Sequence, residues 1–92
     1  MAATFRDNRA LSRFELDDSG VTAVANYRLA GGVIAFTHTE VPPQARGKGL
    51  ASRLIAGALE SIRARGLKVV AQCSFVQDYL AKHPEFRDLV AG

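Results

Sequence analysis

The sequence predicts one mixed α/β domain of the α+β kind, with three antiparallel strands followed by a helix, a parallel strand and a second helix. Three observations support this order. The first half of the chain alternates between apolar and polar residues, a strong helical periodicity follows from residue 49, and a short valine-rich segment comes directly after it. The 92 residues, of which 48% are hydrophobic, suffice for one small core, and no repeat or linker divides them. We therefore expect residues 1–92 to form a single domain.

The strands are marked by apolar–polar alternation between turn residues. Three segments show it and are expected to pair as an antiparallel sheet, separated by turns at residues 17–20 and 31–32: residues 13–16, 21–29 and 33–41. The third segment is apolar on both faces at its start, which favours a central position. Its far end is expected to carry His38 and Glu40 on the same face as Ile34 and Phe36. Residues 1–10 are polar and are expected to be only partly ordered until the chain joins a sheet.

The clearest helix is predicted over residues 49–65. Its apolar residues recur at helical spacing along one stripe: Leu50, Leu54, Ile55, Ala58, Leu59 and Ile62. Gly66 supplies the stop signal at its C-terminus. Residues 68–73 are expected to form a strand parallel to the third, because the helix provides the crossover that a parallel pair requires.

A second helix is predicted from Ser74 to Pro84. Ser74 and Gln77 have the spacing of a capping box at its start, and Pro84 ends it. Three apolar residues beyond it are expected to pack back on the body of the domain as a short tail: Phe86, Leu89 and Val90.

Composition argues against several classes of function. A net charge of +3 suits an anionic small ligand but is too weak and too scattered for nucleic-acid binding. No apolar run approaches the roughly 20 residues of a membrane span, and the N-terminus lacks the apolar stretch of a signal peptide. A lone cysteine, Cys73, and two separated histidines give neither an internal disulfide nor the spacing of a metal site. We therefore expect a cytoplasmic monomer or homodimer with no metal, nucleic-acid or membrane partner.

The most informative segment leads from Val41 through a proline pair and a basic, glycine-containing turn into the first helix. Backbone amides exposed at a helix start suit an anion. Acids are normally preferred there, yet this helix start holds three cations and no acid: Arg46, Lys48 and Arg53. A phosphate-bearing ligand would balance these charges, and a solvated basic turn is the alternative interpretation.

This segment resembles the coenzyme-binding signature of the GCN5-related N-acetyltransferase superfamily, Arg/Gln-x-x-Gly-x-Gly/Ala at a strand-to-helix turn. The signature fits in two registers, one starting at Gln44 and one starting at Arg46: Gln44, Gly47 and Gly49, or Arg46, Gly49 and Ala51. We prefer the second, because Val41 and Pro43 then match the Val-x-Pro that commonly precedes the signature, and Leu54 matches its first core leucine.

The resemblance extends from Phe14 onward to the small, stand-alone acetyltransferase-like proteins. Four further segments carry it: residues 38–43, residues 46–51, Cys73 and residues 82–86. One departure is Ala71, where members often have proline two residues before the cysteine. Longer acetyltransferases add helices and strands that form a wall for the acceptor, and we expect no counterpart of that wall in these 92 residues.

The resemblance implies a minimal acetyltransferase fold that uses acetyl-coenzyme A as co-substrate. Five residues would bind its pyrophosphate through backbone amides or charge, and Leu50 completes this loop: Arg46, Gly47, Lys48, Gly49 and Ala51. Backbone groups of Thr39 and Val41 would hold the pantetheine arm, and Tyr79 would face the leaving sulfur, although core packing is an alternative role for Tyr79.

Acyl transfer to an amine needs a base and an acid for the departing thiolate. Glu40 is the expected base and His38 an alternative base. Cys73, against a helix N-terminus, can serve as a proton donor or a transient acyl carrier. The competing interpretations are a core cysteine, a hydrogen-bonded structural histidine and an ion-paired glutamate.

The sequence leaves two functions open. The first is an N-acetyltransferase that moves an acetyl group to an amine of a small molecule, a peptide or a protein lysine. The second is a coenzyme A-binding or acyl-coenzyme A-binding module, or partner subunit, that does not catalyse. A nucleotide-binding phosphate loop is rejected, because such a loop requires glycine at position 42 and a hydroxyl after Lys48, where this chain has Pro42 and Gly49.

Overall fold

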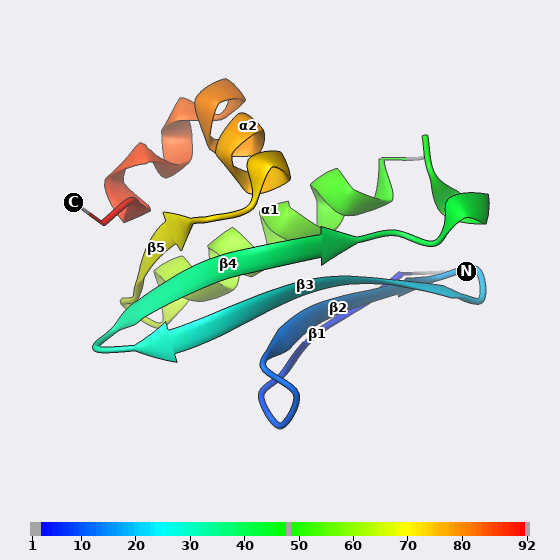
Figure 1. Cartoon of the computed structure of the whole chain (residues 1–92), viewed down its shortest axis with the longest axis horizontal. Coiled ribbons are helices and arrows are strands. Elements are labelled where there is room, and N and C mark those ends of the chain that lie inside the picture. The colour runs from blue at the N-terminus through cyan, green and yellow to red at the C-terminus, as the bar shows by residue number, and fades with distance from the viewer. Residues whose placement is uncertain (1–2, 48, 92) are drawn as a thin grey trace.

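The computed structural model describes residues 3–47 and 49–91 and has one five-stranded sheet with helices on one side (Figure 1). The strands are β1 (Thr4–Asn8), β2 (Arg13–Asp18), β3 (Val21–Ala30), β4 (Val33–Glu40) and β5 (Lys68–Ala71). The helices are α1 (Leu50–Ala64) and α2 (Ser74–Lys82), with short 3₁₀ turns η1 (Pro43–Ala45) and η2 (Pro84–Leu89). The strands lie in the order β1-β2-β3-β4-β5, and the predicted α+β class is confirmed.

Strands β1 to β4 are antiparallel neighbours, and two of their three connections are two-residue turns. Ser19 and Gly20 join β2 to β3 with φ of 55° and 83°, and Gly31 and Gly32 join β3 to β4 with φ of 58° and 79°. Positive φ at both central residues is the geometry that matches the twist of a hairpin. The predicted turns are therefore confirmed.

Strand β1 is an element that the sequence did not lead us to expect. Residues 4–8 pair with β2 along its whole length, from Thr4 opposite Asp17 to Asn8 opposite Arg13. The Phe5 ring stacks on Phe14 at 5.8 Å between ring centroids and lies against Gly57 of α1. This stretch is ordered where it joins the sheet, because one aromatic anchor and the ladder hold a strand that has no alternation of its own.

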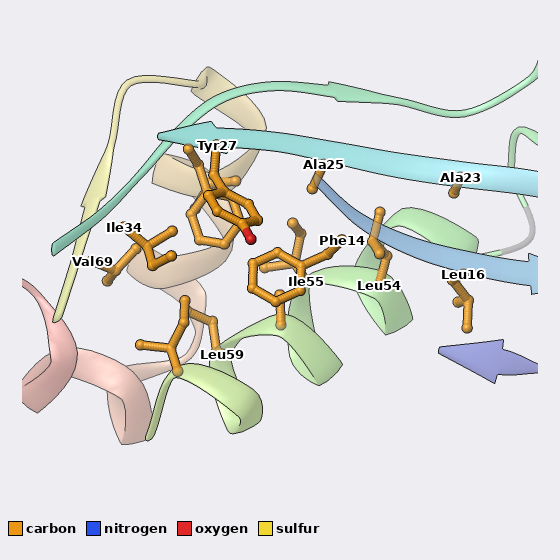
Figure 2. Close-up of a cluster of buried hydrophobic side chains, with 14 of the residues drawn as sticks. Phe14, Leu16, Ala23, Ala25, Tyr27, Ile34, Leu54, Ile55, Leu59 and Val69 are labelled. Carbon is orange, nitrogen blue, oxygen red and sulfur yellow. The ribbon is translucent and has the colours of Figure 1, made fainter. Parts of the chain in front are cut away.

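Helix α1 packs across one face of the sheet and supplies a third of the buried core residues. All six residues of the predicted apolar stripe are buried: Leu50, Leu54, Ile55, Ala58, Leu59 and Ile62. Figure 2 shows Leu54, Ile55 and Leu59 facing Phe14 and Tyr27 from the strands above. None of the described helices is long and apolar enough to cross a membrane.

Strand β5 follows α1 and pairs parallel to β4, as predicted, from Lys68 opposite Val33 to Ala71 opposite Phe36. Helix α2 then begins at Ser74, with Cys73 as its N-cap residue. The predicted capping box is wrong, because no side chain caps this helix and the side-chain Nε2 of Gln77 donates instead to the Ala71 carbonyl at 3.0 Å.

The C-terminal tail folds back as η2, with Phe86 and Leu89 buried as expected. Val90 stays 43% exposed and forms a parallel bridge with Val69 of β5, so it covers the strand edge and does not enter the core.

Candidate functional site

Exposed backbone amides gather where η1 leads into α1. Gly47 and Gly49 adopt φ of 83° and 72°, the left-handed region that glycine enters at no steric cost, and a Cβ at either position would meet open space. Within residues 3–47 and 49–91, the amides of Gly47, Gly49, Leu50 and Ala51 have no hydrogen-bond acceptor. Arg46 differs, because its amide donates to the Pro43 carbonyl at 3.3 Å. The loop therefore presents a smaller set of free amides than the sequence predicts.

The cations of this loop do not share one environment. Arg53 donates to Asp18 of β2 at 2.6 Å, and this hydrogen bond lowers the pKa of the Asp18 carboxyl. Arg46 is exposed and forms no ion pair with any described residue. Lys48 lies outside the described residues. Arg53 is thus balanced by the protein itself, whereas Arg46 lies beside the free amides with its charge uncompensated among the described groups.

A β-bulge in β4 decides which way the candidate catalytic side chains face. Phe36 pairs with Tyr27 but His38 pairs with Asn26, so Thr37 is an extra residue, and its hydroxyl donates to the Asn26 carbonyl at 3.4 Å. Directly opposed antiparallel residues share a face, so Thr39, opposite the buried Ala25, lies on the α1 side.

The bulge corrects one prediction from the sequence. His38 and Glu40 lie on the face away from α1, and not on the face of Ile34 and Phe36, because an extra residue in one strand reverses the alternation that follows it.

Strands β4 and β5 part beyond this bulge. Their pairing ends with Phe36 opposite Ala71, and the last bond between them runs from the Gln72 amide to the Phe36 carbonyl at 2.9 Å. Strand β4 continues to Glu40 without β5 beside it, and the Val41 amide has no acceptor in the described part of the chain. The two strands therefore open into a cleft with unpaired backbone along one side.

Cys73 lies on the far side of this opening, opposite Thr39. Its thiol donates to the Thr39 hydroxyl at 3.4 Å. Burial raises the pKa of the Cys73 thiol, but its hydrogen bond with the Thr39 hydroxyl and the nearby backbone amides of Val76, Phe75 and Thr39 outweigh burial and leave the pKa below its ordinary value. The lowered pKa agrees with the position of Cys73 at a helix N-terminus.

His38 and Glu40 form a loose pair at the end of β4. The Nε2 atom of His38 lies 3.9 Å from Oε1 of Glu40, and the two side chains are 63% and 69% exposed. Neither is buried by the protein, so each is free to contact a molecule placed over this end of the sheet.

Two adjoining cavities connect the loop to this pair. One, of about 200 Å³, is lined by the loop residues Gly47, Gly49 and Leu50. The second, of about 330 Å³, is lined by His38, Thr39 and Glu40. Four residues line both cavities: Val41, Arg46, Ala51 and Phe75. A single elongated ligand can therefore reach from the free amides to His38 and Glu40.

Tyr79 lies apart from this path. Its ring packs on His83 at 3.8 Å between centroids, and both residues line a separate cavity of about 140 Å³ between α1 and α2. Burial raises the pKa of Tyr79. Tyr79 lines neither of the two cavities described above, so the geometry favours its packing role.

The sequence did not lead us to single out Phe75 as a site residue. In the structure it lines all three of these cavities and forms their shared wall. Its position directly after the first residue of α2 was the one available signal, since a side chain there lies beside the opening of the sheet. Among the described residues, no group of three His, Cys, Asp or Glu side chains could hold a metal ion.

Comparison with known proteins gives matches at the level of family, sequence and fold. The model of the family described as GCN5-related N-acetyl-transferase matches residues 13–89. Protein NATD1 of Homo sapiens and of Gallus gallus are each 35% identical to this chain over 63 residues, which is 67% of the chain. The match spans 56% of the human protein and 57% of the chicken protein, so the aligned part is little more than half of these relatives.

The fold match covers more of the chain. A GCN5-like protein from Staphylococcus aureus, solved by NMR in solution, superimposes with a TM-score of 0.73 at 27% sequence identity, over 97% of this chain and 88% of that one. The match of the family model over residues 13–89, with the strand-to-helix turn and the parted strands inside it, shows that this chain belongs to the GCN5-related N-acetyltransferase family.

Proposed function

We propose that this chain binds acetyl-coenzyme A and transfers the acetyl group to an amine. One observation carries the proposal: free amides at the start of α1 lie at one end of a continuous hollow whose other end is lined by His38 and Glu40. Acetyl-coenzyme A has the matching sequence of groups, with a diphosphate, a long narrow pantetheine arm and a thioester. We also propose that residues 1–92 act as one domain.

The diphosphate would accept hydrogen bonds from the amides of Gly47, Gly49, Leu50 and Ala51. Bonds to a charged oxygen are worth about 1.5–3 kcal/mol each, and binding must also offset the cost of ordering the ligand. Arg46 would add charge beside the diphosphate, and Lys48 follows it in the sequence. The pantetheine arm would lie along β4, where the Val41 amide and the backbone of Thr39 can bond to its amide groups.

In the transfer step the amine nitrogen attacks the thioester carbonyl, a C–N bond forms and the C–S bond breaks. Glu40 is the proposed base that takes the proton from the amine, directly or through water, and His38 is the alternative base. Cys73 is the proposed donor of a proton to the departing thiolate, since its lowered pKa eases that transfer. We also propose a reducing, cytoplasmic location, since the sequence holds a single cysteine and so cannot form an internal disulfide.

The test measures coenzyme A release from acetyl-coenzyme A with a panel of amines and basic peptides. We expect acceptor-dependent release in the wild type and a loss of at least about tenfold in kcat for Glu40→Gln, with acetyl-coenzyme A affinity retained. Cys73→Ala should lower kcat without loss of binding. The matched control is Glu60→Gln, an exposed glutamate on α1 that should leave both quantities unchanged.

The second candidate is a coenzyme A-binding module without catalysis. The exposure of His38 and Glu40 favours it, because nothing in the described chain encloses them. Tight binding of acetyl-coenzyme A with no release above the rate in buffer, for any acceptor, would select this second function over the first.

A further inference from the structure

The face of the sheet away from α1 is uncovered. In Figure 1 helix α1 lies behind β4, and no described helix crosses the face toward the viewer. The alternation of the strands places several apolar side chains on this face, and four of them are half-buried: Val24, Val33, Ala35 and Val70. His38 and Glu40 point to the same face because of the bulge at Thr37.

This face offers no enclosure for a free small amine. Small ligands are normally held in hollows that bury most of their surface. The only described cavity lined by His38 or Glu40 is the one of about 330 Å³ that the pantetheine arm would occupy. An acceptor must therefore supply the missing cover with its own surface.

The charged side chains on this face come from all five strands. Arg6 and Arg13 are paired with Glu15, and Arg6 also binds Asp17. Lys68 of β5 donates to the Asp88 carbonyl at 2.8 Å. Glu40 and Arg28 form no ion pair with a described residue, apart from the loose contact of Glu40 with His38 at 3.9 Å.

The spacing of those two charges suits an extended chain. Glu40 lies opposite Val24 of β3, and Arg28 is four residues further along β3 on the same face. Four residues of a strand span about 13 Å, and an extended peptide laid over β3 covers the same length in four residues. A lysine near Glu40 would then place an acidic side chain four positions away beside Arg28.

We propose that the acceptor is an extended segment of a peptide or protein, which lies over the apolar face of β3 and β4 with its target lysine near Glu40 and a carboxylate near Arg28. This inference rests on the proposed function and specifies its acceptor. Apolar side chains of the segment would cover Val24 and Ala35 and exclude water from the thioester.

The test uses synthetic peptides of eleven residues with one central lysine. The fourth residue before the lysine and the fourth residue after it are both aspartate, both serine or both arginine. Nα-acetyl-lysine amide serves as the small amine. Two quantities are measured with saturating acetyl-coenzyme A: kcat/KM for coenzyme A release, and peptide affinity by fluorescence anisotropy in the presence of coenzyme A. We expect kcat/KM for the aspartate peptide to exceed that of the small amine at least about tenfold and that of the arginine peptide about two- to fivefold, as for an exposed ion pair.

The variant Arg28→Glu should reverse the order of the aspartate and arginine peptides in both readouts. Arg87→Glu, an exposed arginine in η2, is the matched control and should keep the wild-type order. Equal kcat/KM for the small amine and all peptides would overturn the inference, and so would an unchanged order of the aspartate and arginine peptides in Arg28→Glu. In either case, turnover of acetyl-coenzyme A would still support the proposed function. Failure to bind acetyl-coenzyme A at all would instead overturn the proposed function and this inference with it.

Discussion

Replacement of Gly49 tests the loop most sharply, because it separates backbone strain from ligand binding. Gly49 is the N-cap residue of α1 with φ of 72° and ψ of 16°, and a Cβ there would meet no atom within 4 Å. The left-handed conformation costs an L-residue about 1–2 kcal/mol, and the stiffer unfolded chain of alanine offsets about 0.4–1 kcal/mol of this. Gly49→Ala should therefore lower the free energy of unfolding by about 1 kcal/mol, which corresponds to a fall in Tm of about 4–8 °C.

The same substitution should weaken acetyl-coenzyme A binding for a separate reason. The added methyl group lies beside the amides of Leu50 and Ala51 and would push the diphosphate away from at least one of them. Loss of one hydrogen bond to a charged oxygen, worth about 1.5–3 kcal/mol, lowers affinity roughly 10- to 150-fold.

Gly66 provides the matched control. It has φ of 69°, follows the C-terminus of α1, and also has open space at its Cβ position. Gly66→Ala should lose similar stability in urea denaturation followed by circular dichroism, with no change in affinity by calorimetry. Gly49→Asn should lose less stability than Gly49→Ala, since asparagine tolerates this region, yet lose affinity to a similar extent. Equal affinity for Gly49→Ala and Gly66→Ala would refute the placement of the diphosphate.

Three further predictions use the other polar groups. The pKa of Cys73 is lowered by its hydrogen bonds, so iodoacetamide should react with Cys73 at a lower pH than with a free thiol. Thr39→Val should raise the pH at which this reaction begins. An unchanged pH profile of the reaction would mean that the Thr39 hydroxyl does not lower the pKa of Cys73. Glu15 has a side chain that is 3% exposed, and its pKa is lowered chiefly by Arg13, so Glu15 stabilises the fold fully above the ordinary carboxyl pKa and loses this contribution as pH falls below it. Glu15→Gln should therefore make the free energy of unfolding fall less steeply toward acid pH. A fall as steep as in the wild type would count against this account. Burial and a hydrogen bond to Asp7 at 2.7 Å raise the pKa of Tyr27 to about 12. Tyr27 therefore stabilises the fold below pH 10, and this contribution is lost as pH rises toward 12. Absorbance at 295 nm should show that Tyr27 ionises at a higher pH than an ordinary tyrosine, and Tyr27→Phe should remove this late step.

Most of the fold could be predicted because its elements carry strong local signals. The buried stripe of α1 and the glycine turns of the hairpins each follow from residue spacing alone. Strand β1 could not be predicted in this way, since Phe5 is its one large apolar anchor and the strand depends on pairing with β2 and on the space left by Gly57.

The candidate site was predictable in composition but not in orientation. The sequence predicts Gly47 and Gly49 as loop residues, and both adopt positive φ. The orientation of His38 and Glu40 depends on the bulge at Thr37, and threonine fits a regular strand so well that it gives no local sign of a bulge. The Arg46 amide finds its partner within the local turn η1, whereas long-range packing brings Asp18 to the Arg53 guanidinium.

The most direct measurement is the ¹H–¹⁵N spectrum of the protein during titration with acetyl-coenzyme A. The account predicts that the largest amide shifts fall on Gly47, Gly49, Leu50 and Ala51, with smaller shifts at Val41 and none at Gly66. Shifts confined to exposed basic side chains, or spread evenly over both ends of α1, would contradict it.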